Sequence, residues 1–214
     1  MYQPTHFAET RTETLHALIG AHPLATLVTQ DSAGMLQADP IPLLIDAGPT
    51  PLGTLRGHVA RANPLWRETR GDVDALAVFH GAQSYVSPGW YPGKAEHGKV
   101  VPTWNYVVVQ ARGRLRAIDD ANWLRALVTR LTDRFEATMR QPWHVADAPA
   151  DYIEQMLRAI VGIEIEVTSL VVKWKVSQNR SAADRAGVVA GLSALDDDAA
   201  AAAMAAEVKS RSGG

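Results

Sequence analysis

Residues 104–118 read WNYVVVQARGRLRAI, and their side chains alternate between apolar and polar. One face would carry Val107, Val109, Ala111, Gly113 and Leu115. The other face would carry Gln110, Arg112, Arg114 and Arg116. A period of two is typical of a β-strand with one buried face, because successive side chains point to opposite sides. We therefore predict that these residues form the longest strand of the protein.

Shorter segments with strand character lie on both sides of this strand. We predict strands at residues 24–30, 35–45, 53–58, 75–79 and 83–87, and one bent strand or a strand pair at residues 163–176. Pro40 and Pro42 cannot donate backbone hydrogen bonds. The strand at residues 35–45 should therefore lie at a sheet edge or contain a bulge.

Helices are predicted mainly in the second half of the chain. Asp120 can cap a helix at residues 121–139. The apolar stripe of that helix would be Trp123, Leu124, Leu127, Val128, Leu131 and Phe135. Further helices are expected at residues 8–21 and from Pro149 to about residue 160, with a helix or turn at residues 59–69. Residues 199–206 hold seven alanines and one methionine, so we expect a domain at 1–192 and an alanine-rich helical or disordered tail at 193–214.

The element order and the composition limit the class of protein. Strands without βαβ alternation predict an α+β fold that is mainly antiparallel β and barrel-like. The 214 residues are 47% hydrophobic and 21% charged, as in soluble globular proteins. They show no long apolar run, no signal-peptide pattern and no cysteine, so we expect a cytoplasmic protein with no membrane association and no disulfide. The net charge of -2 argues against a dedicated nucleic-acid surface.

Aromatic residues gather between residues 85 and 106. Five of the 14 aromatic residues lie there, namely Tyr85, Trp90, Tyr91, Trp104 and Tyr106. Trp and Tyr combine a flat apolar ring with a hydrogen-bond donor, which suits the wall of a site for a planar ligand. The same residues could instead form a core cluster that holds a loop in place.

Two polar clusters could contact such a ligand. Residues 57–64, GHVARANP, offer His58, Arg61 and Asn63 at a predicted helix start, where a phosphate finds suitable donors. The alternative is a capped turn in which Asn63 holds the backbone and Arg61 faces water. Residues 173–180, KWKVSQNR, could close over the polar rim of a ligand, or they could be an exposed strand end and a helix cap.

Several motifs of catalytic proteins are absent from the sequence. It contains no glycine-rich dinucleotide or Walker loop, no nucleophile elbow and no paired-histidine zinc helix. The seven histidines are scattered, without metal-ligand spacing. We therefore predict no catalytic residues and no metal site.

Six motifs together resemble one family. They are residues 1–7 (MYQPTHF), 22–29 (HPLATLVT), 57–64 (GHVARANP), 85–88 (YVSP), 101–106 (VPTWNY) and 175–179 (KVSQN). In this order they resemble the PaiB-like proteins, described as FMN-binding negative transcriptional regulators, over residues 1 to about 192. The resemblance implies a split β-barrel of the pyridoxamine-phosphate-oxidase type with peripheral helices. It also implies a homodimer with FMN between the subunits.

The resemblance also assigns roles to residues. Related split barrels bind the FMN phosphate after the third strand, the place of His58, Arg61 and Asn63, and Arg61 would be the strongest anchor. The segment at residues 85–106, here called the aromatic loop, would lie near the isoalloxazine. The predicted FMN contacts are His58, Arg61, Asn63, Tyr85, Ser87, Trp90, Lys94, Thr103, Trp104, Asn105, Lys175, Gln178 and Asn179.

Two functions follow from the resemblance. The first is a flavin-dependent regulator or sensor, in which the state of FMN changes how the dimer meets DNA or a protein partner. The second is an oxidoreductase that uses bound FMN to reduce or oxidise a small molecule. The sequence shows no helix-turn-helix that would read DNA directly. A third possibility is that another planar cofactor, such as haem, replaces FMN.

Overall fold

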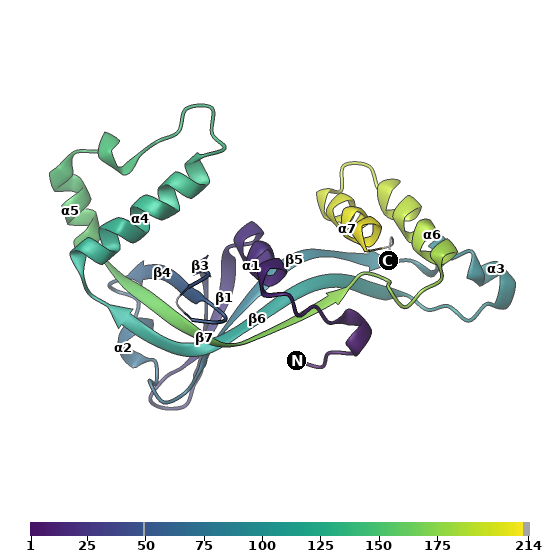
Figure 1. Cartoon of the computed structure of the whole chain (residues 1–214), viewed down its shortest axis with the longest axis horizontal. Coiled ribbons are helices and arrows are strands. Elements are labelled where there is room, and N and C mark those ends of the chain that lie inside the picture. Colours follow the sequence, from purple (N-terminus) through teal and green to yellow (C-terminus); the bar gives the residue numbers. More distant parts are fainter. Residues whose placement is uncertain (49, 212–214) are drawn as a thin grey trace. The chain divides into compact units, whose positions relative to one another are not determined.

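The strand predicted at residues 104–118 is β6 (Thr103–Ile118) of a computed structural model that describes residues 1–48 and 50–211 (Figure 1). The chain divides into two compact units, each built from separate stretches of sequence. Residues 19–79 and 110–170 form one, here called the barrel unit. Residues 1–18, 80–109 and those from 171 onward form the other, here called the terminal unit because both chain ends belong to it.

The strands form one sheet in the hydrogen-bonded order β2-β1-β5-β6-β7-β4-β3. Their bounds are β1 (Leu24–Gln30), β2 (Leu36–Pro42), β3 (Leu44–Asp46), β4 (Thr54–Ala60), β5 (Ala75–Val86), β6 and β7 (Ile160–Lys175). β1 pairs antiparallel with β2 and β5, and β4 pairs antiparallel with β3 and β7. Only Leu43 separates β2 from β3, although these strands hold opposite ends of the order. The sheet therefore curls back on itself within the barrel unit, as in a split barrel.

The alternation predicted along β6 is confirmed. Val107, Val109, Ala111 and Gly113 are buried, Leu115 is half-buried, and Arg112, Arg114 and Arg116 are exposed. Gly113 lies against β7, where a Cβ atom would come within 1.9 Å of the carbonyl oxygen of Glu166. A side chain at this position would push the two strands apart.

The helices of the barrel unit are α2 (Leu65–Glu68), α4 (Ala121–Glu136), η3 (Val145–Asp147) and α5 (Ala150–Arg158). Asp120 caps α4 as predicted, since its side chain accepts a hydrogen bond of 2.7 Å from the backbone N–H of Trp123. Leu124 packs with Ile153 and Leu157 of α5, while Leu127 and Leu131 pack on Leu44. The predicted stripe is confirmed except at Phe135, which is exposed because α4 ends one residue later.

The helices of the terminal unit are η1 (Thr5–Phe7), η2 (Pro88–Trp90), α3 (Gly93–His97), α6 (Ala182–Ser193) and α7 (Ala199–Ser210), while α1 (Thr12–Ala21) runs from this unit into the other. α6 and α7 form a hairpin (Figure 1). The helix expected at 199–206 is present as α7, and its buried residues are Ala201, Met204, Ala205 and Val208. Residues 212–214 of the predicted tail lie outside the described residues. Across residues 1–48 and 50–211, no helix is long and apolar enough to cross a bilayer.

Five of the predicted elements differ from the structure. The strands expected at residues 75–79 and 83–87 are one strand, β5, because Gly81 packs closely on Val107 and pairing with β6 continues through it. The strand expected at residues 35–45 is broken at Leu43, where the chain passes from β2 to β3; β2 does lie at the sheet edge, as predicted from its prolines. The segment at residues 59–69 begins as strand, because Val59 and Ala60 pair with β7. The first helix begins at Thr12, after an extended segment that follows η1.

Candidate functional site

The predicted FMN contacts fall into two sets, one in each unit. His58, Arg61 and Asn63 belong to the barrel unit. The other ten, which are Tyr85, Ser87, Trp90, Lys94, Thr103, Trp104, Asn105, Lys175, Gln178 and Asn179, belong to the terminal unit.

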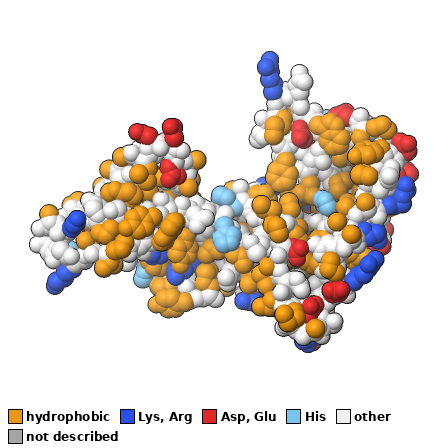
Figure 2. Space-filling model, turned by 180° about the vertical axis from the view of Figure 1, so that it is seen from behind, with side chains coloured by type: hydrophobic (Ala, Val, Ile, Leu, Met, Phe, Trp, Pro, Cys, Tyr) orange, Lys and Arg blue, Asp and Glu red, His pale blue; other side chains and the backbone are white. Residues whose placement is uncertain are grey.

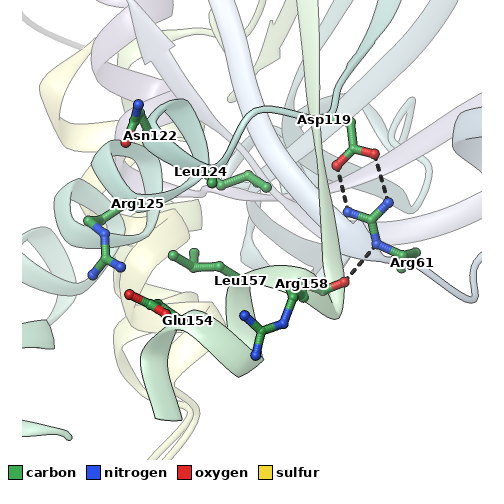
Figure 3. Close-up of a pocket in the computed structure, with 9 residues that line it drawn as sticks. Arg61, Asp119, Asn122, Leu124, Arg125, Glu154, Leu157 and Arg158 are labelled. Atoms are coloured by element: carbon green, nitrogen blue, oxygen red, sulfur yellow. Dashed lines mark hydrogen bonds and ion pairs between the residues drawn. The ribbon is translucent and has the colours of Figure 1, made fainter. Parts of the chain in front are cut away.

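Arg61 follows the last residue of β4 and forms a bidentate ion pair with Asp119 (Figure 3). Its Nη1 and Nη2 atoms donate to the two carboxylate oxygens over 2.8 and 2.6 Å. Its Nε atom donates to the carbonyl of Arg158 over 2.7 Å, and Nη2 also donates to that of Ile160 over 3.0 Å. The hydrogen bond from Arg61 lowers the pKa of Asp119. A phosphate that binds Arg61 must therefore compete with a carboxylate already in place.

The ion pair borders a pocket of about 410 Å³ between α4 and α5, so a solute can reach it (Figure 3). Leu124 and Leu157 supply the apolar part of the pocket wall. Arg125, Glu154 and Arg158 also line it, and none of the three takes part in an ion pair within the described part of the chain. The wall thus carries both signs of charge.

Asn63 adopts the capped turn that the sequence left open as an alternative. Its Oδ1 accepts a hydrogen bond from the backbone N–H of Leu65 over 2.9 Å, and its Nδ2 donates to Asp39 over 3.0 Å. The same alternative placed Arg61 in water, but its guanidinium pairs with Asp119 instead. His58 is half-buried on β4, and its Nδ1 is buried without a hydrogen-bond partner among the described residues. Burial lowers the pKa of His58, so the imidazole is neutral at pH 7.

In the terminal unit, Trp104 and Tyr85 expose their rings. Trp104 is 55% exposed and Tyr85 is 44% exposed, and their ring centroids lie 6.2 Å apart in an edge-to-face arrangement. Trp104 and Tyr106 also line a pocket of about 280 Å³ with His80, Gly81, Gln83, Val107 and Val108. Apolar side chains reach the surface over this unit in the view of Figure 2. These rings are therefore available to a ligand and are not part of the core.

The other two aromatic residues of the cluster have a packing role. Tyr91 is buried, and Trp90 is half-buried against α6. The two alternatives for the aromatic cluster thus apply to different residues. Trp104 and Tyr106 are two positions apart on β6, on the side opposite the buried row, which is why they are more accessible.

Two lysines of β7 lie beside the ring of Tyr106. The Nζ atoms of Lys173 and Lys175 are 5.5 and 5.9 Å from the centroid of the Tyr106 ring. Lys175 also donates to the hydroxyl of Thr103 and to the carbonyl of Trp104. Burial lowers the pKa of Lys175, and the charge of Lys173 adds to this effect. No ion pair of the described residues involves either lysine.

We call Tyr85, Trp104, Tyr106, Lys173 and Lys175 the aromatic-lysine surface. It combines exposed rings with positive charge that no acidic side chain balances, which is the chemistry that a planar anionic ligand requires. The predicted contacts omit Tyr106 and Lys173. The period of two along each strand could have identified them, because Tyr106 follows Trp104 and Lys173 precedes Lys175 on the same faces.

The remaining predicted residues mostly hold the backbone. Ser87 caps η2 by accepting from the N–H of Gly89 over 3.1 Å, and Gln178 bridges Val176 and Trp174. Asn105 is buried and donates to Ser177 over 2.9 Å, while its Oδ1 has no partner among the described residues. Lys94 and Asn179 are exposed.

The sequence matches the model of a family described as "Putative FMN-binding domain" over residues 1–169. An uncharacterized protein of Emericella nidulans is 33% identical over 233 aligned positions, which cover 93% of each chain. The Bacillus subtilis protein named "Protease synthase and sporulation protein PAI 2" is 29% identical over 197 positions, covering 88% of this chain and 87% of that one.

Solved structures confirm the fold. The FAD and heme binding protein of Mycobacterium smegmatis superposes with a TM-score of 0.57 at 19% identity, covering 79% of this chain and 73% of that one. At this identity the likeness concerns architecture alone. The superposition shows the split-barrel fold. The family match over residues 1–169 shows that this chain belongs to the FMN-binding family to which the PaiB-like proteins belong, with FMN as its cofactor.

Proposed function

We propose that the chain binds FMN at the aromatic-lysine surface and acts as a flavin-dependent regulator or sensor. The observation that carries the proposal is the exposed ring of Trp104 on the same side of β6 as Tyr106, whose ring lies beside two lysines without acidic partners among the described residues. The flavin ring system is planar and its faces can stack on aromatic rings, so it gains by contact with Trp104 and Tyr106. The FMN phosphate carries nearly two negative charges at pH 7, so it gains by contact with a cation.

The barrel unit offers a ligand-binding group of its own. His58 Nδ1 is a buried polar atom without a partner in the described chain, and such an atom stabilises the fold only when something bonds to it. A neutral His58 can donate or accept a hydrogen bond. Asn105 Oδ1 also has no partner among the described residues, but Asn105 lies in the buried row of β6, on the side opposite Trp104 and Tyr106. When bound, FMN supplies one- and two-electron redox chemistry.

Arg61, in the barrel unit, is a separate candidate for binding the phosphate, and Asp119 controls its use. The guanidinium must release both carboxylate oxygens before it can hold a phosphate with the same fork. Its bonds to the carbonyls of Arg158 and Ile160 keep it in place meanwhile. The phosphate contact predicted from the sequence is therefore an exchange of one anion for another.

The two candidate functions make different demands on the pocket beside Trp104. An oxidoreductase usually places a proton donor or acceptor near its substrate. The exposed imidazole of His80 lines the pocket and could take that role, and no carboxylate lines it among the described residues. The Bacillus subtilis relative is named for protease synthesis and sporulation, and the PaiB-like proteins that this chain resembles are described as transcriptional regulators; the proposal of regulation rests on these descriptions. The cytoplasmic location stays a prediction from composition.

The experiment that tests this function is a reductant titration of the FMN-loaded protein. For a sensor, NAD(P)H should not be consumed in multiple turnovers, either in air or with added quinone or nitro acceptors. Chemical reduction of the flavin should change the hydrodynamic radius or the binding of a partner. Sustained turnover with any acceptor would instead establish the oxidoreductase.

We propose a homodimer as the functional unit. β2 and β3 each pair with only one strand in the sheet order, and a barrel seam of this kind is commonly covered by a second copy. Light scattering at micromolar concentration should then give twice the chain mass of 23.1 kDa. A mass equal to that of one chain would refute the dimer.

A further inference from the structure

The α6–α7 hairpin contacts both segments that present the terminal unit's predicted FMN contacts. It begins after residue 169, where the match to the family model ends. None of its residues belongs to the aromatic-lysine surface. Its contacts with the aromatic loop and with β7 are nevertheless close and specific.

α6 holds the aromatic loop through two glycines. A Cβ atom at Gly187 would lie 2.0 Å from the carbonyl oxygen of Trp90, and one at Gly191 would lie 2.3 Å from Cδ2 of its ring. Any side chain at these positions would displace Trp90. Nearby, the carboxylate of Asp184 accepts a hydrogen bond of 3.2 Å from the backbone N–H of Gly93.

α7 holds the lysine-bearing end of β7 through Trp174. This residue is buried, and its Nε1 donates to Glu207 over 2.8 Å. The guanidinium of Arg211 lies 4.0 Å from the centroid of the Trp174 ring and also pairs with Glu9 over 3.0 Å. Trp174 stands between Lys173 and Lys175 in the strand, so its side chain points to the opposite face. Fixing Trp174 on one face fixes the position of both lysines on the other.

We propose that the α6–α7 hairpin is the positioning element of the flavin site. Glu207 would set the lysines through Trp174, and Gly191 would set the aromatic loop through Trp90. The inference rests on the proposed function, since it assumes that FMN meets the aromatic-lysine surface. It assigns a purpose to a helix that composition alone marks as an alanine-rich tail.

The first test compares variants of Glu207. Glu207→Ala removes the acceptor of the Trp174 hydrogen bond, whereas Glu207→Gln keeps an oxygen there. Lys209→Ala, at an exposed position of α7, is the matched control. We expect Glu207→Ala to weaken FMN binding about tenfold, while Glu207→Gln and Lys209→Ala stay within about twofold. Gly191→Ala should weaken binding in the same way, because its new methyl group displaces Trp90, whereas Ala190→Ser on the exposed side should not.

A second readout needs no cofactor. The pH dependence of Lys175 acylation, measured by mass spectrometry on the free protein, should shift toward that of a lysine in a short unstructured peptide in Glu207→Ala, because Lys175 loses its partly buried position. A purely structural hairpin would behave differently. Its variants would unfold at lower urea, but FMN affinity and the Lys175 profile of the folded protein would stay at wild-type values, and this result would overturn the inference.

The same measurements separate this inference from the proposed function. If Trp104→Ala and Lys175→Met weaken FMN binding but Glu207→Ala and Gly191→Ala do not, only the positioning role is wrong. If Trp104→Ala and Lys175→Met also leave FMN binding unchanged, the aromatic-lysine surface is not the flavin site and both proposals fail.

Discussion

Replacing Trp104 with alanine tests the proposed site most directly. The ring is more than half exposed and packs edge to face on the ring of Tyr85. The change removes the largest ring of the aromatic-lysine surface and leaves the buried row of β6 intact. It should therefore affect ligand binding more than folding.

The structure sets the size of both effects. A fully covered aromatic side chain buries about 150–250 Å², so Trp104 covers about 100 Å², which at ~25 cal/mol/Å² corresponds to at most about 2.5 kcal/mol of unfolding free energy. A fully buried tryptophan would lose about 3–5 kcal/mol. Stacking on an aromatic ring contributes about 1–3 kcal/mol, so the dissociation constant of FMN should rise by about 5- to 150-fold.

The assay is a fluorescence titration of FMN, together with equilibrium unfolding in urea. Flavin emission should be quenched less in the variant, because Trp104 no longer lies beside the ring. Trp143→Ala is the matched control, since this ring is 43% exposed and belongs to the barrel unit. Its loss should leave FMN affinity within about twofold.

One combination of results would refute the reasoning. If Trp104→Ala lowers the unfolding free energy by about 3 kcal/mol or more, yet binds and quenches FMN like the wild type, then Trp104 is a core residue. The ligand would then bind elsewhere. If Trp104→Ala and Trp143→Ala instead lose FMN affinity equally, the loss reflects a general effect on folding.

Three further predictions concern charge and packing. Because burial lowers the pKa of Lys175, its charge is lost at a lower pH than that of an ordinary lysine, so FMN affinity should fall as pH rises from 7 toward about 10. This dependence should flatten in Lys175→Met and persist in Lys209→Met, as followed by titrations at each pH. Arg61→Ala should weaken the binding of FMN more than that of riboflavin, which lacks the phosphate. Asp119→Asn should strengthen the binding of FMN alone, because it frees the guanidinium of Arg61. Unchanged FMN affinity in both variants would place the phosphate at Lys173 or Lys175. Gly113→Ala should lower the free energy of unfolding, measured in urea, by about 1–3 kcal/mol or more, because its methyl group meets the Glu166 carbonyl. Gly71→Ala, with open space around it, should change that free energy by less than about 0.5 kcal/mol.

Elements with strong local signals could be predicted from the sequence. β6 follows from strict alternation, and α4 follows from its Asp120 cap and apolar stripe. β5 was predicted as two pieces, because Gly81 looks like a break until its partner Val107 is known. The break at Leu43 was missed for a related reason, since which strands pair is decided by distant segments and not by the residues of β2 and β3.

The site shows the same limit. The donors of Arg61 could be read from the sequence, but Asp119, 58 residues further along, could not be identified as its partner. The aromatic cluster was found as a group, but only the packing of α6 on Trp90 separates its structural members from its exposed ones. Lys173 and Tyr106 could have been predicted from strand periodicity alone.

The pairing of β4 has a consequence for the newly made chain. Thr54 of β4 pairs with Glu166 of β7, so the backbone groups along one edge of β4 stay unpaired until a strand about 110 residues later in the chain has been synthesised. At about 5–20 residues per second, the ribosome needs roughly 5–20 s to deliver that partner. During this time the β3–β4 hairpin presents an open edge to other chains in the cell, which is the kind of surface that chaperones protect. Slower translation through α4 and α5 would lengthen this exposure, and the yield of native protein should therefore depend on the speed of synthesis between residues 60 and 160.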